Sequence, residues 1–266
     1  MINLVLLKTT VKKNWVLLFI FFAVLTFYMT IMLAMYDPHD TEAIMSMLEL
    51  FPEDLMKAMG FSGLVTTLTG YLASWLYGLL MLGFPMVYCI ILANRLVVKM
   101  VDNTSFAFLL STPNSRSRII VTQGVYALIS LLVLFAALFG VGVMVSSIMF
   151  QDALDIGAFF KLNVTTMLVN MVVMMICFFF SCLFNEVKRS AAFGAGIPIA
   201  FLLMHMLGGV SPDAEILKRV SIYGFYDPME VVHSGTVMGA NLAYSVCIVL
   251  LFAGSILVFN RKRLLL

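Results

Sequence analysis

One serine in this chain has neighbours that could make it a nucleophile. Ser62 lies in the stretch Gly60-Phe61-Ser62-Gly63. A serine attacks a carbonyl group only when a base within about 3 Å accepts its proton, and His205 or His233 could supply that base from the same side of a membrane. Gly60 can also simply end a short helix, without any role in chemistry. An intramembrane hydrolase with Ser62 as its nucleophile is therefore one alternative function.

A second unusual stretch separates two long apolar runs. Residues 94–118 read NRLVVKMVDNTSFAFLLSTPNSRSR. Because the residue before a proline avoids the helical region, Pro113 predicts a turn after a short helix. Apolar side chains exposed on that helix and rimmed by Ser and Arg are typical of a docking surface, although they could also sink into lipid headgroups. The expected exposed residues are Phe106, Phe108, Leu109 and Leu110.

The sequence lacks the motifs and ionisable groups that would supply energy for transport. No G-x-x-x-x-G-K-[ST] motif occurs, and no Gly-Lys pair is present, so we expect no nucleotide site and no cofactor on this chain. The four cysteines have no metal-ligand spacing. Ion-coupled carriers usually need an ionisable group near the bilayer midplane, and the only candidate within a long apolar run is His205. Any uphill work therefore requires an energy source on another polypeptide.

The elements that must position these residues are membrane-spanning helices. The 266 residues are 62% hydrophobic and 11% charged, which excludes an ordinary soluble domain and gives no basis for nucleic-acid binding. A spanning helix needs about 20 apolar residues. Six runs meet this demand and predict a single all-α transmembrane domain over residues 1–266, with spans at 15–36, 70–93, 119–149, 162–184, 191–208 and 239–259.

The basic residues indicate the orientation. If both termini are cytoplasmic, the inner segments hold 12 of the 16 Lys and Arg residues. Such an excess is typical of cytoplasmic loops. We therefore expect a multi-pass protein with its N and C termini in the cytoplasm.

Shorter elements are expected at both membrane surfaces. Residues 1–14 predict a short amphipathic helix on the cytoplasmic face, or else a basic flank that anchors the first span. Residues 209–238 predict short outer helices, one of them capped by Asp227 with Pro228 at its first position. Pro85 and Pro198 each remove a hydrogen bond within a span, so we expect both helices to kink or break there.

The stretch FAFLLSTPNSRSRIIVTQ resembles the cytoplasmic loop of ABC-2 type permeases, the membrane subunits of bacterial ABC exporters. Family members carry a segment of the form L-L-S-T-P-x-S-R-x-x-I after the second span. The matching residues are Leu109, Leu110, Ser111, Thr112, Pro113, Ser115, Arg116 and Ile119. Ala107 departs from the family, because an acidic residue is common at that position.

The resemblance implies a fold, partners and a mode of action. It implies the ABC-2 exporter fold, a separate ATP-binding subunit that holds ATP and Mg²⁺, and a second permease copy or paralogue in a bacterial cytoplasmic membrane. Residues 94–118 would form the cytoplasmic coupling loop, and the cargo would be hydrophobic or amphipathic. The other class is a non-transport protein, either the hydrolase or a scaffold. The implied coupling residues are Asp102, Phe106, Phe108, Leu109, Leu110, Ser111, Thr112, Pro113, Ser115 and Arg116.

Overall fold

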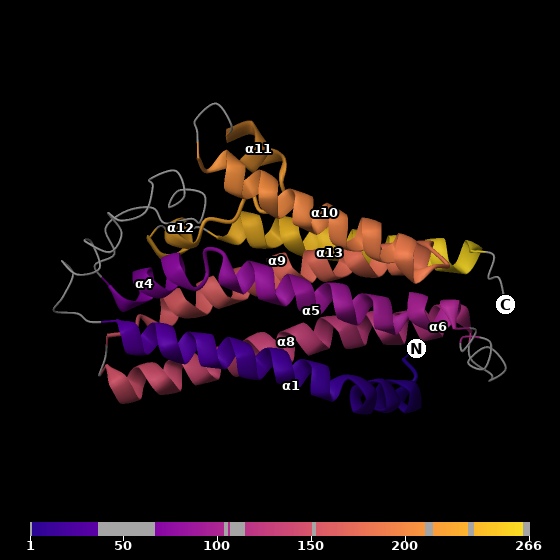
Figure 1. Ribbon diagram of the computed structural model, residues 1–266, viewed down its shortest axis with the longest axis horizontal. Helices are drawn as coiled ribbons and strands as arrows, with labels where there is room; N and C mark the ends of the chain where they lie inside the picture. Colours follow the sequence, from indigo (N-terminus) through magenta and orange to yellow (C-terminus); the bar gives the residue numbers. More distant parts are fainter. Residues whose placement is uncertain are drawn as a thin grey trace.

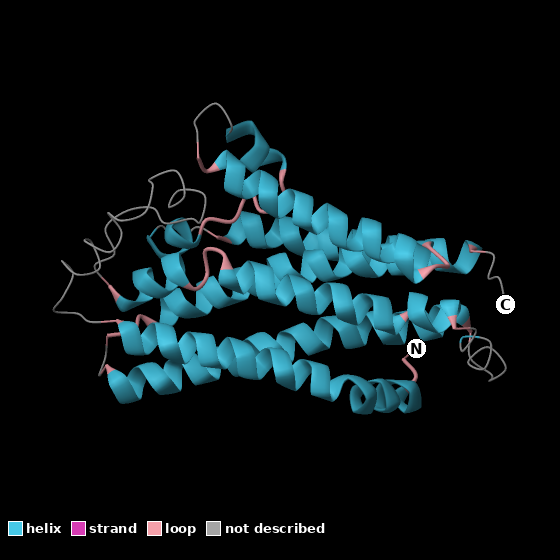
Figure 2. Ribbon diagram, viewed as in Figure 1, coloured by secondary structure: helices cyan, strands magenta, loops and turns pink. Residues whose placement is uncertain are grey.

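The chain folds into a bundle of long helices. The computed structural model describes residues 2–36, 67–103, 106, 115–150, 153–210, 215–233 and 237–262. Within these ranges the chain consists of helices, turns and short connections, without any strand (Figure 2). Six helical segments of the described chain are long and apolar enough to cross a membrane. The prediction of an all-α polytopic membrane protein with six spans is confirmed.

The helices fall into two groups by length. The six spans are α1 (Leu4–Met35), α5 (Leu80–Leu96) with α6 (Val98–Asp102), α8 (Arg116–Met149), α9 (Ile156–Leu183), α10 (Val187–Gly208) and α13 (Met238–Arg261). Three shorter helices are α4 (Leu68–Trp75), α11 (Glu215–Val220) and α12 (Pro228–His233). The expected second span at 70–93 is thus divided between α4 and α5, and helix continues through α6 into the expected coupling loop.

The spans run side by side along the long axis of the molecule (Figure 1). α1 packs along α8, while α9 packs against α5, α8, α10 and α13 and is the most buried span. Both termini lie at one end, together with α6, and α4 and α12 lie at the other.

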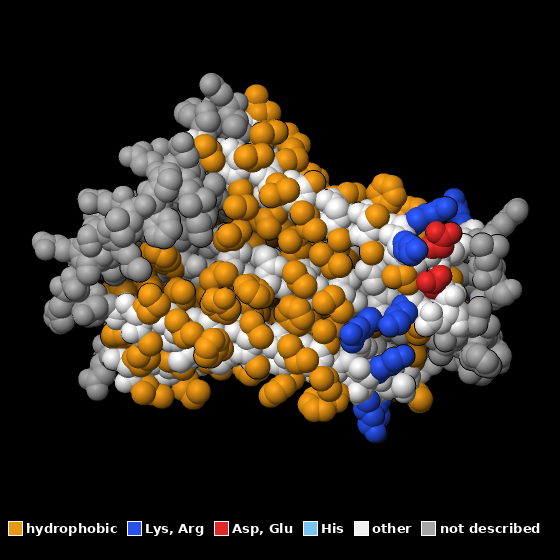
Figure 3. Space-filling model, viewed as in Figure 1, with side chains coloured by type: hydrophobic (Ala, Val, Ile, Leu, Met, Phe, Trp, Pro, Cys, Tyr) orange, Lys and Arg blue, Asp and Glu red, His pale blue; other side chains and the backbone are white. Residues whose placement is uncertain are grey.

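Lysine and arginine gather at the end that holds the termini, which we call the basic end (Figure 3). Apolar side chains cover the middle of the face shown. Of the described basic residues, three belong to elements at the opposite end, namely Lys161, Lys218 and Arg219. The basic end carries Lys8, Lys12, Lys13, Arg95, Lys99, Arg116, Arg118, Lys188, Arg189, Arg261 and Lys262.

α1 is a single helix. It is capped by Asn3, whose Oδ1 accepts hydrogen bonds from the backbone N–H groups of Val5 (3.0 Å) and Leu6 (3.1 Å). It continues through residue 14 to Met35, so the expected surface helix and the first span are not separated by a break. Its first turns are out of line with the rest of the helix (Figure 1).

Both span prolines lie inside unbroken helices, because α9 satisfies the backbone groups that they free. Pro85 leaves the carbonyl oxygen of Met81 without its usual partner. Asn170 donates to this oxygen through Nδ2 at 3.0 Å. Pro198 likewise frees the carbonyl oxygen of Gly194, which accepts a hydrogen bond from the Cys177 thiol at 3.0 Å. Neither helix is broken at its proline, and the expected kink at each proline stays a prediction.

The break in this part of the chain lies instead at residues 76–79, between α4 and α5. The carbonyl oxygen of Tyr77 accepts a hydrogen bond from the Tyr226 hydroxyl at 2.9 Å. That hydroxyl also pairs with Thr166 Oγ1 at 2.8 Å. The Tyr77 hydroxyl accepts from Asn163 Nδ2 at 2.9 Å. Two residues of α9 thus hold the broken segment.

A third interruption, between α5 and α6, also meets α9. Ser181 Oγ donates to the carbonyl oxygen of Ala93 at 2.9 Å and accepts from the N–H of Val98 at 3.0 Å. Spacings of three, four and seven residues place these α9 side chains on one face of the helix. The set, which we call the α9 stripe, consists of Asn163, Thr166, Asn170, Cys177 and Ser181.

α8 packs closely against a neighbouring helix at a glycine, where it carries no side chain. A Cβ atom added to Gly124 would lie 2.3 Å from a ring carbon of Phe252 in α13. One added to Gly140, on the same helix, would meet nothing within 4 Å. Of these two glycines, packing therefore requires Gly124 and not Gly140.

We predict that Gly124→Ala destabilises the protein. Forcing the Phe252 ring aside should lower the free energy of unfolding by about 1–3 kcal/mol. Thermal unfolding of the purified protein in detergent measures this, with Gly140→Ala as the matched control. Gly140→Ala should leave the melting temperature unchanged or slightly raised, because alanine favours helix. Equal loss in both variants would contradict the packing role of Gly124.

Candidate functional site

The candidate site is the segment between α6 and α8, whose two flanks are described. On the first flank, Asp102 is exposed at the end of α6. Phe106 is fully buried, and its ring packs edge-on against Phe259 of α13 with 5.2 Å between centroids. The expectation that Phe106 is exposed is wrong, because its ring turns inward onto the last turns of α13. Six of the expected residues lie outside the described ranges, namely Phe108, Leu109, Leu110, Ser111, Thr112 and Pro113.

The second flank also contacts the end of α13. Ser115 caps α8, since its Oγ accepts from the N–H of Arg118 at 3.3 Å. The guanidinium of Arg116 donates through Nη1 to the carbonyl oxygen of Lys262 at 3.0 Å. Ser117 Oγ donates to Asn260 Oδ1 at 3.0 Å. Hence both flanks of the segment are fixed to the last residues of α13.

Lys262 extends this connection to α9. Its ammonium donates to the carbonyl oxygens of Cys182 and Phe184, at the end of α9. It also lies 5.5 Å from the centre of the Phe259 ring. Burial lowers the pKa of Lys262 to about 8, so the amine is still mostly protonated at neutral pH. A cation at the carboxyl end of a helix is favoured by the helix dipole.

The start of α8 is joined to α1 as well. The N–H of Asn3 donates to Thr122 Oγ1 at 3.0 Å, and Thr10 Oγ1 donates to Gln123 Oε1 at 3.3 Å. A displacement of the segment at the basic end would therefore reach α1, α8, α9 and α13 through directed contacts.

The sequence matches one protein family over nearly its whole length. That family is described as ABC-2 family transporter protein, and the match covers residues 7–264. The chain belongs to this family. None of the curated proteins matches it.

Family membership identifies the chain as the membrane-spanning permease subunit of an ABC transporter. The predicted resemblance to ABC-2 type permeases is confirmed. Such permeases are transport subunits that associate with ATP-binding subunits.

The alternative hydrolase would use Ser62, which lies outside the described residues, with His205 or His233 as its base. His205, in α10, lies beside Tyr223 with 5.8 Å between ring centroids, and His233 ends α12. Among the described residues, no group of three or more His, Cys, Asp or Glu side chains could hold a metal ion.

The expected outer cap residues form a helix start. Asp227 Oδ1 accepts from the N–H groups of Met229 (3.1 Å) and Glu230 (3.2 Å), and Pro228 is the first residue of α12. The Asp227 carboxylate also lies 3.5 Å from the Lys218 ammonium, which connects α12 to α11.

Sequence reasoning missed the residues that hold the flanks in place. The sequence predicts Phe259 only as the last residue of a span and indicates no role for Asn260 or Lys262. The α9 stripe carries neither a charge nor a known motif, although polar residues recurring on one face of an apolar helix are a usable signal.

We predict that Phe106→Ala loosens the first flank. Removing a fully buried phenylalanine ring should lower the free energy of unfolding by about 3 kcal/mol. Thermal unfolding of the permease in detergent measures the loss. Phe27→Ala is the control, since Phe27 is 64% exposed on α1. Similar losses in both variants would contradict the anchoring of Phe106 on α13.

Proposed function

We propose that this permease exports hydrophobic or amphipathic cargo from a bacterial cell, driven by ATP and Mg²⁺ bound to a separate ATP-binding subunit. Residues 101–116 form the coupling segment that meets this subunit. Movement of the subunit on ATP binding and hydrolysis pushes the segment and shifts the bundle between inward-facing and outward-facing states.

The double attachment of the coupling segment carries the proposal. Phe106 and Arg116, one on each flank, both contact the end of α13, and Lys262 connects that end to α9. A force on the loop between them is therefore delivered to two spans rather than absorbed by a free loop. Phe108, Leu109 and Leu110 supply the apolar surface that docks, while Asp102 and Ser115 supply polar rims.

The nature of the cargo is inferred from the spans. Within the six apolar runs there is no Asp, Glu, Lys or Arg. A path that offers no charged partner favours apolar or amphipathic molecules, such as a membrane-active peptide, a lipid-like molecule or a drug.

The permease works as a pair, with a second copy or a paralogue. Six helices of this length leave little room for a path inside one bundle. Few residues of α10 and α13 are buried, which supports a lipid-facing or partner-facing role for both, and α1 shares this low burial.

The coupling role predicts that Phe108→Glu with Leu109→Glu detaches the ATP-binding subunit. An unpaired charge buried in the contact costs more than 1.4 kcal/mol, so ATPase activity co-purifying with the tagged permease should fall at least about tenfold. The matched control is Phe225→Glu, at the opposite end, where Phe225 is 70% exposed. Retention of full ATPase activity by the double variant would refute the docking role of this segment.

The proposed orientation predicts that both termini face the cytoplasm. Tags placed before residue 2 and after residue 266 should resist protease added to intact spheroplasts and be cleaved after permeabilisation. A tag inserted at Gly235, between α12 and α13 in the sequence, should be cleaved in intact spheroplasts. Cleavage of the terminal tags in intact spheroplasts would place the coupling segment outside the cell and overturn the mechanism.

A further inference from the structure

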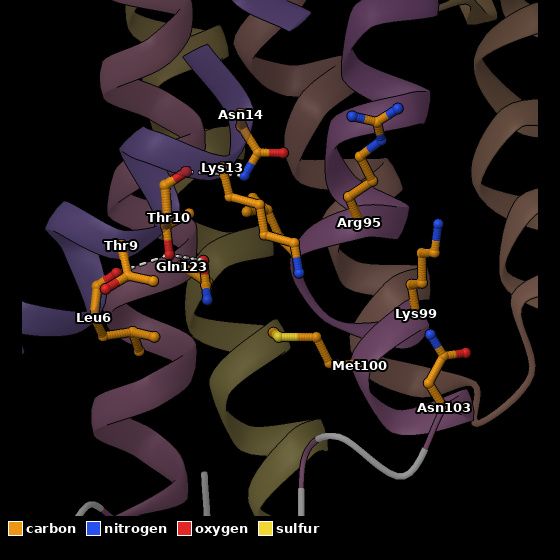
Figure 4. Close-up of a pocket in the computed structure, with 11 residues that line it drawn as sticks. Leu6, Thr9, Thr10, Lys13, Asn14, Arg95, Lys99, Met100, Asn103 and Gln123 are labelled. Atoms are coloured by element: carbon orange, nitrogen blue, oxygen red, sulfur yellow. Dashed lines mark hydrogen bonds between the residues drawn. The ribbon is translucent and has the colours of Figure 1, made fainter. Parts of the chain in front are cut away.

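A cavity of about 520 Å³ opens at the basic end, between the start of α1, the α5–α6 region and α8 (Figure 4). It borders the start of the coupling segment at Asn103, and its lining includes Lys13, Arg95 and Lys99, which the coupling argument does not use. Its walls combine charged, polar and apolar side chains.

Three cations line the cavity from two sides. Lys13 extends from α1 toward the facing helices, while Arg95 and Lys99 lie one turn apart on α5 and α6 (Figure 4). In the described part of the chain, the carboxylates within 4 Å of a cation belong to other pairs, Arg189 with Glu186 and Lys218 with Asp227. The cavity therefore holds three positive charges that are not neutralised by these carboxylates, which favours an anionic ligand.

Neutral donors complete the back of the cavity. Gln123 is only 2% exposed, and its Oε1 accepts from Thr10. Its Nε2 points away from Thr10 (Figure 4). Thr9 also lines the cavity, and its hydroxyl donates to the carbonyl oxygen of Val5 at 2.9 Å. Donors of this kind suit the oxygens of a phosphate group.

Apolar rows lead from the cavity toward the middle of the molecule. Val16 and Ile20 follow Lys13 by three and seven positions, on the same face of α1, and are 48% and 51% exposed. Val87, eight positions before Arg95 on α5, is 44% exposed. A ligand with a phosphate head and apolar tails would find charge at the cavity and apolar surface along both helices.

We propose that this cavity binds the phosphate-bearing headgroup of an anionic membrane lipid in the leaflet at the basic end. Lys13, Arg95 and Lys99 contact the phosphate oxygens, Gln123 donates from the back, and the acyl chains lie along α1 and α5. The bound lipid connects α1 to α5 and α6 and neutralises their mutual repulsion. Its binding is independent of cargo and of export.

The test is the melting temperature of the purified full-length permease in detergent with added lipid. Short-chain phosphatidylglycerol should raise it by about 5 °C at saturation, while phosphatidylcholine of the same chain length should not. Inorganic phosphate at the same concentration should have no effect, because it lacks the apolar tails. The variant Lys13→Gln, Arg95→Gln, Lys99→Gln should lose the phosphatidylglycerol shift.

The matched control removes the same number of charges from exposed lysines outside the cavity, by Lys8→Gln, Lys12→Gln and Lys188→Gln, and should keep the shift. If the cavity variant fails to fold, the charge-conserving variant Lys13→Arg, Arg95→Lys, Lys99→Arg should fold and keep the shift, and its loss would overturn the proposal.

Three other results would overturn the lipid site. Equal loss of the phosphatidylglycerol shift in the cavity Gln variant and in the control Gln variant would mean general attraction to a basic surface. A shift with inorganic phosphate that depends on the three cations would identify a free-phosphate site. An unchanged lipid shift in the cavity variant, together with loss of the co-purifying ATP-binding subunit, would identify a protein docking surface instead.

Discussion

The structure depends on the hydrogen bonding of backbone groups that helix interruptions free inside an apolar bundle. Within a membrane no water is available to satisfy such groups, and each one left unpaired costs several kcal/mol. Met81 and Gly194 lose their helical partners to prolines, and Tyr77 loses its partner to a turn. All three carbonyl oxygens accept from side chains of α9 or from Tyr226, which α9 holds. This requirement accounts for the central position of α9.

The same requirement separates two kinds of helix contact in the bundle. α9 is tied to α5 and α10 by directed hydrogen bonds, and its last carbonyl groups are tied to the end of α13 by Lys262. α8 is hydrogen-bonded to the end of α13 at Arg116 and Ser117, and deeper in the bundle it meets α13 and α9 through close packing at Gly124 and Gly142. Hydrogen-bonded breaks resist sliding because movement would expose an unpaired carbonyl, whereas packed surfaces can shift between discrete arrangements. In the proposed coupling, a push at residues 101–116 reaches α13 and α9 first, through the contacts of Phe106, Arg116 and Lys262.

The fold follows from the sequence because long apolar runs with few charges have only one stable arrangement in lipid. The lengths of the apolar runs predict six spans. The distribution of Lys and Arg predicts that both termini lie at the same end of the bundle. Finer features depend on tertiary contacts. The interruption at residues 76–79 contains no proline, and it exists because Tyr226 and Asn163 can compensate for it. Phe106 and Phe108 stand in the same apolar stretch of the sequence, and the sequence alone does not reveal that the Phe106 ring packs against Phe259.

The polar residues of the spans are largely committed to the fold, which restricts where cargo can bind. Asn163, Asn170 and Ser181 each spend a donor on a neighbouring helix and are nearly or fully buried. Their donor groups are not free to contact a passing molecule without leaving a backbone or side-chain oxygen of the fold unpaired. The outward faces of α10 and α13, by contrast, expose Phe193, Leu203 and Leu250. In the permease pair proposed above, the transport path would run along such apolar outer faces, where the second subunit closes the other side, and cargo would be recognised by apolar contact rather than by hydrogen bonds.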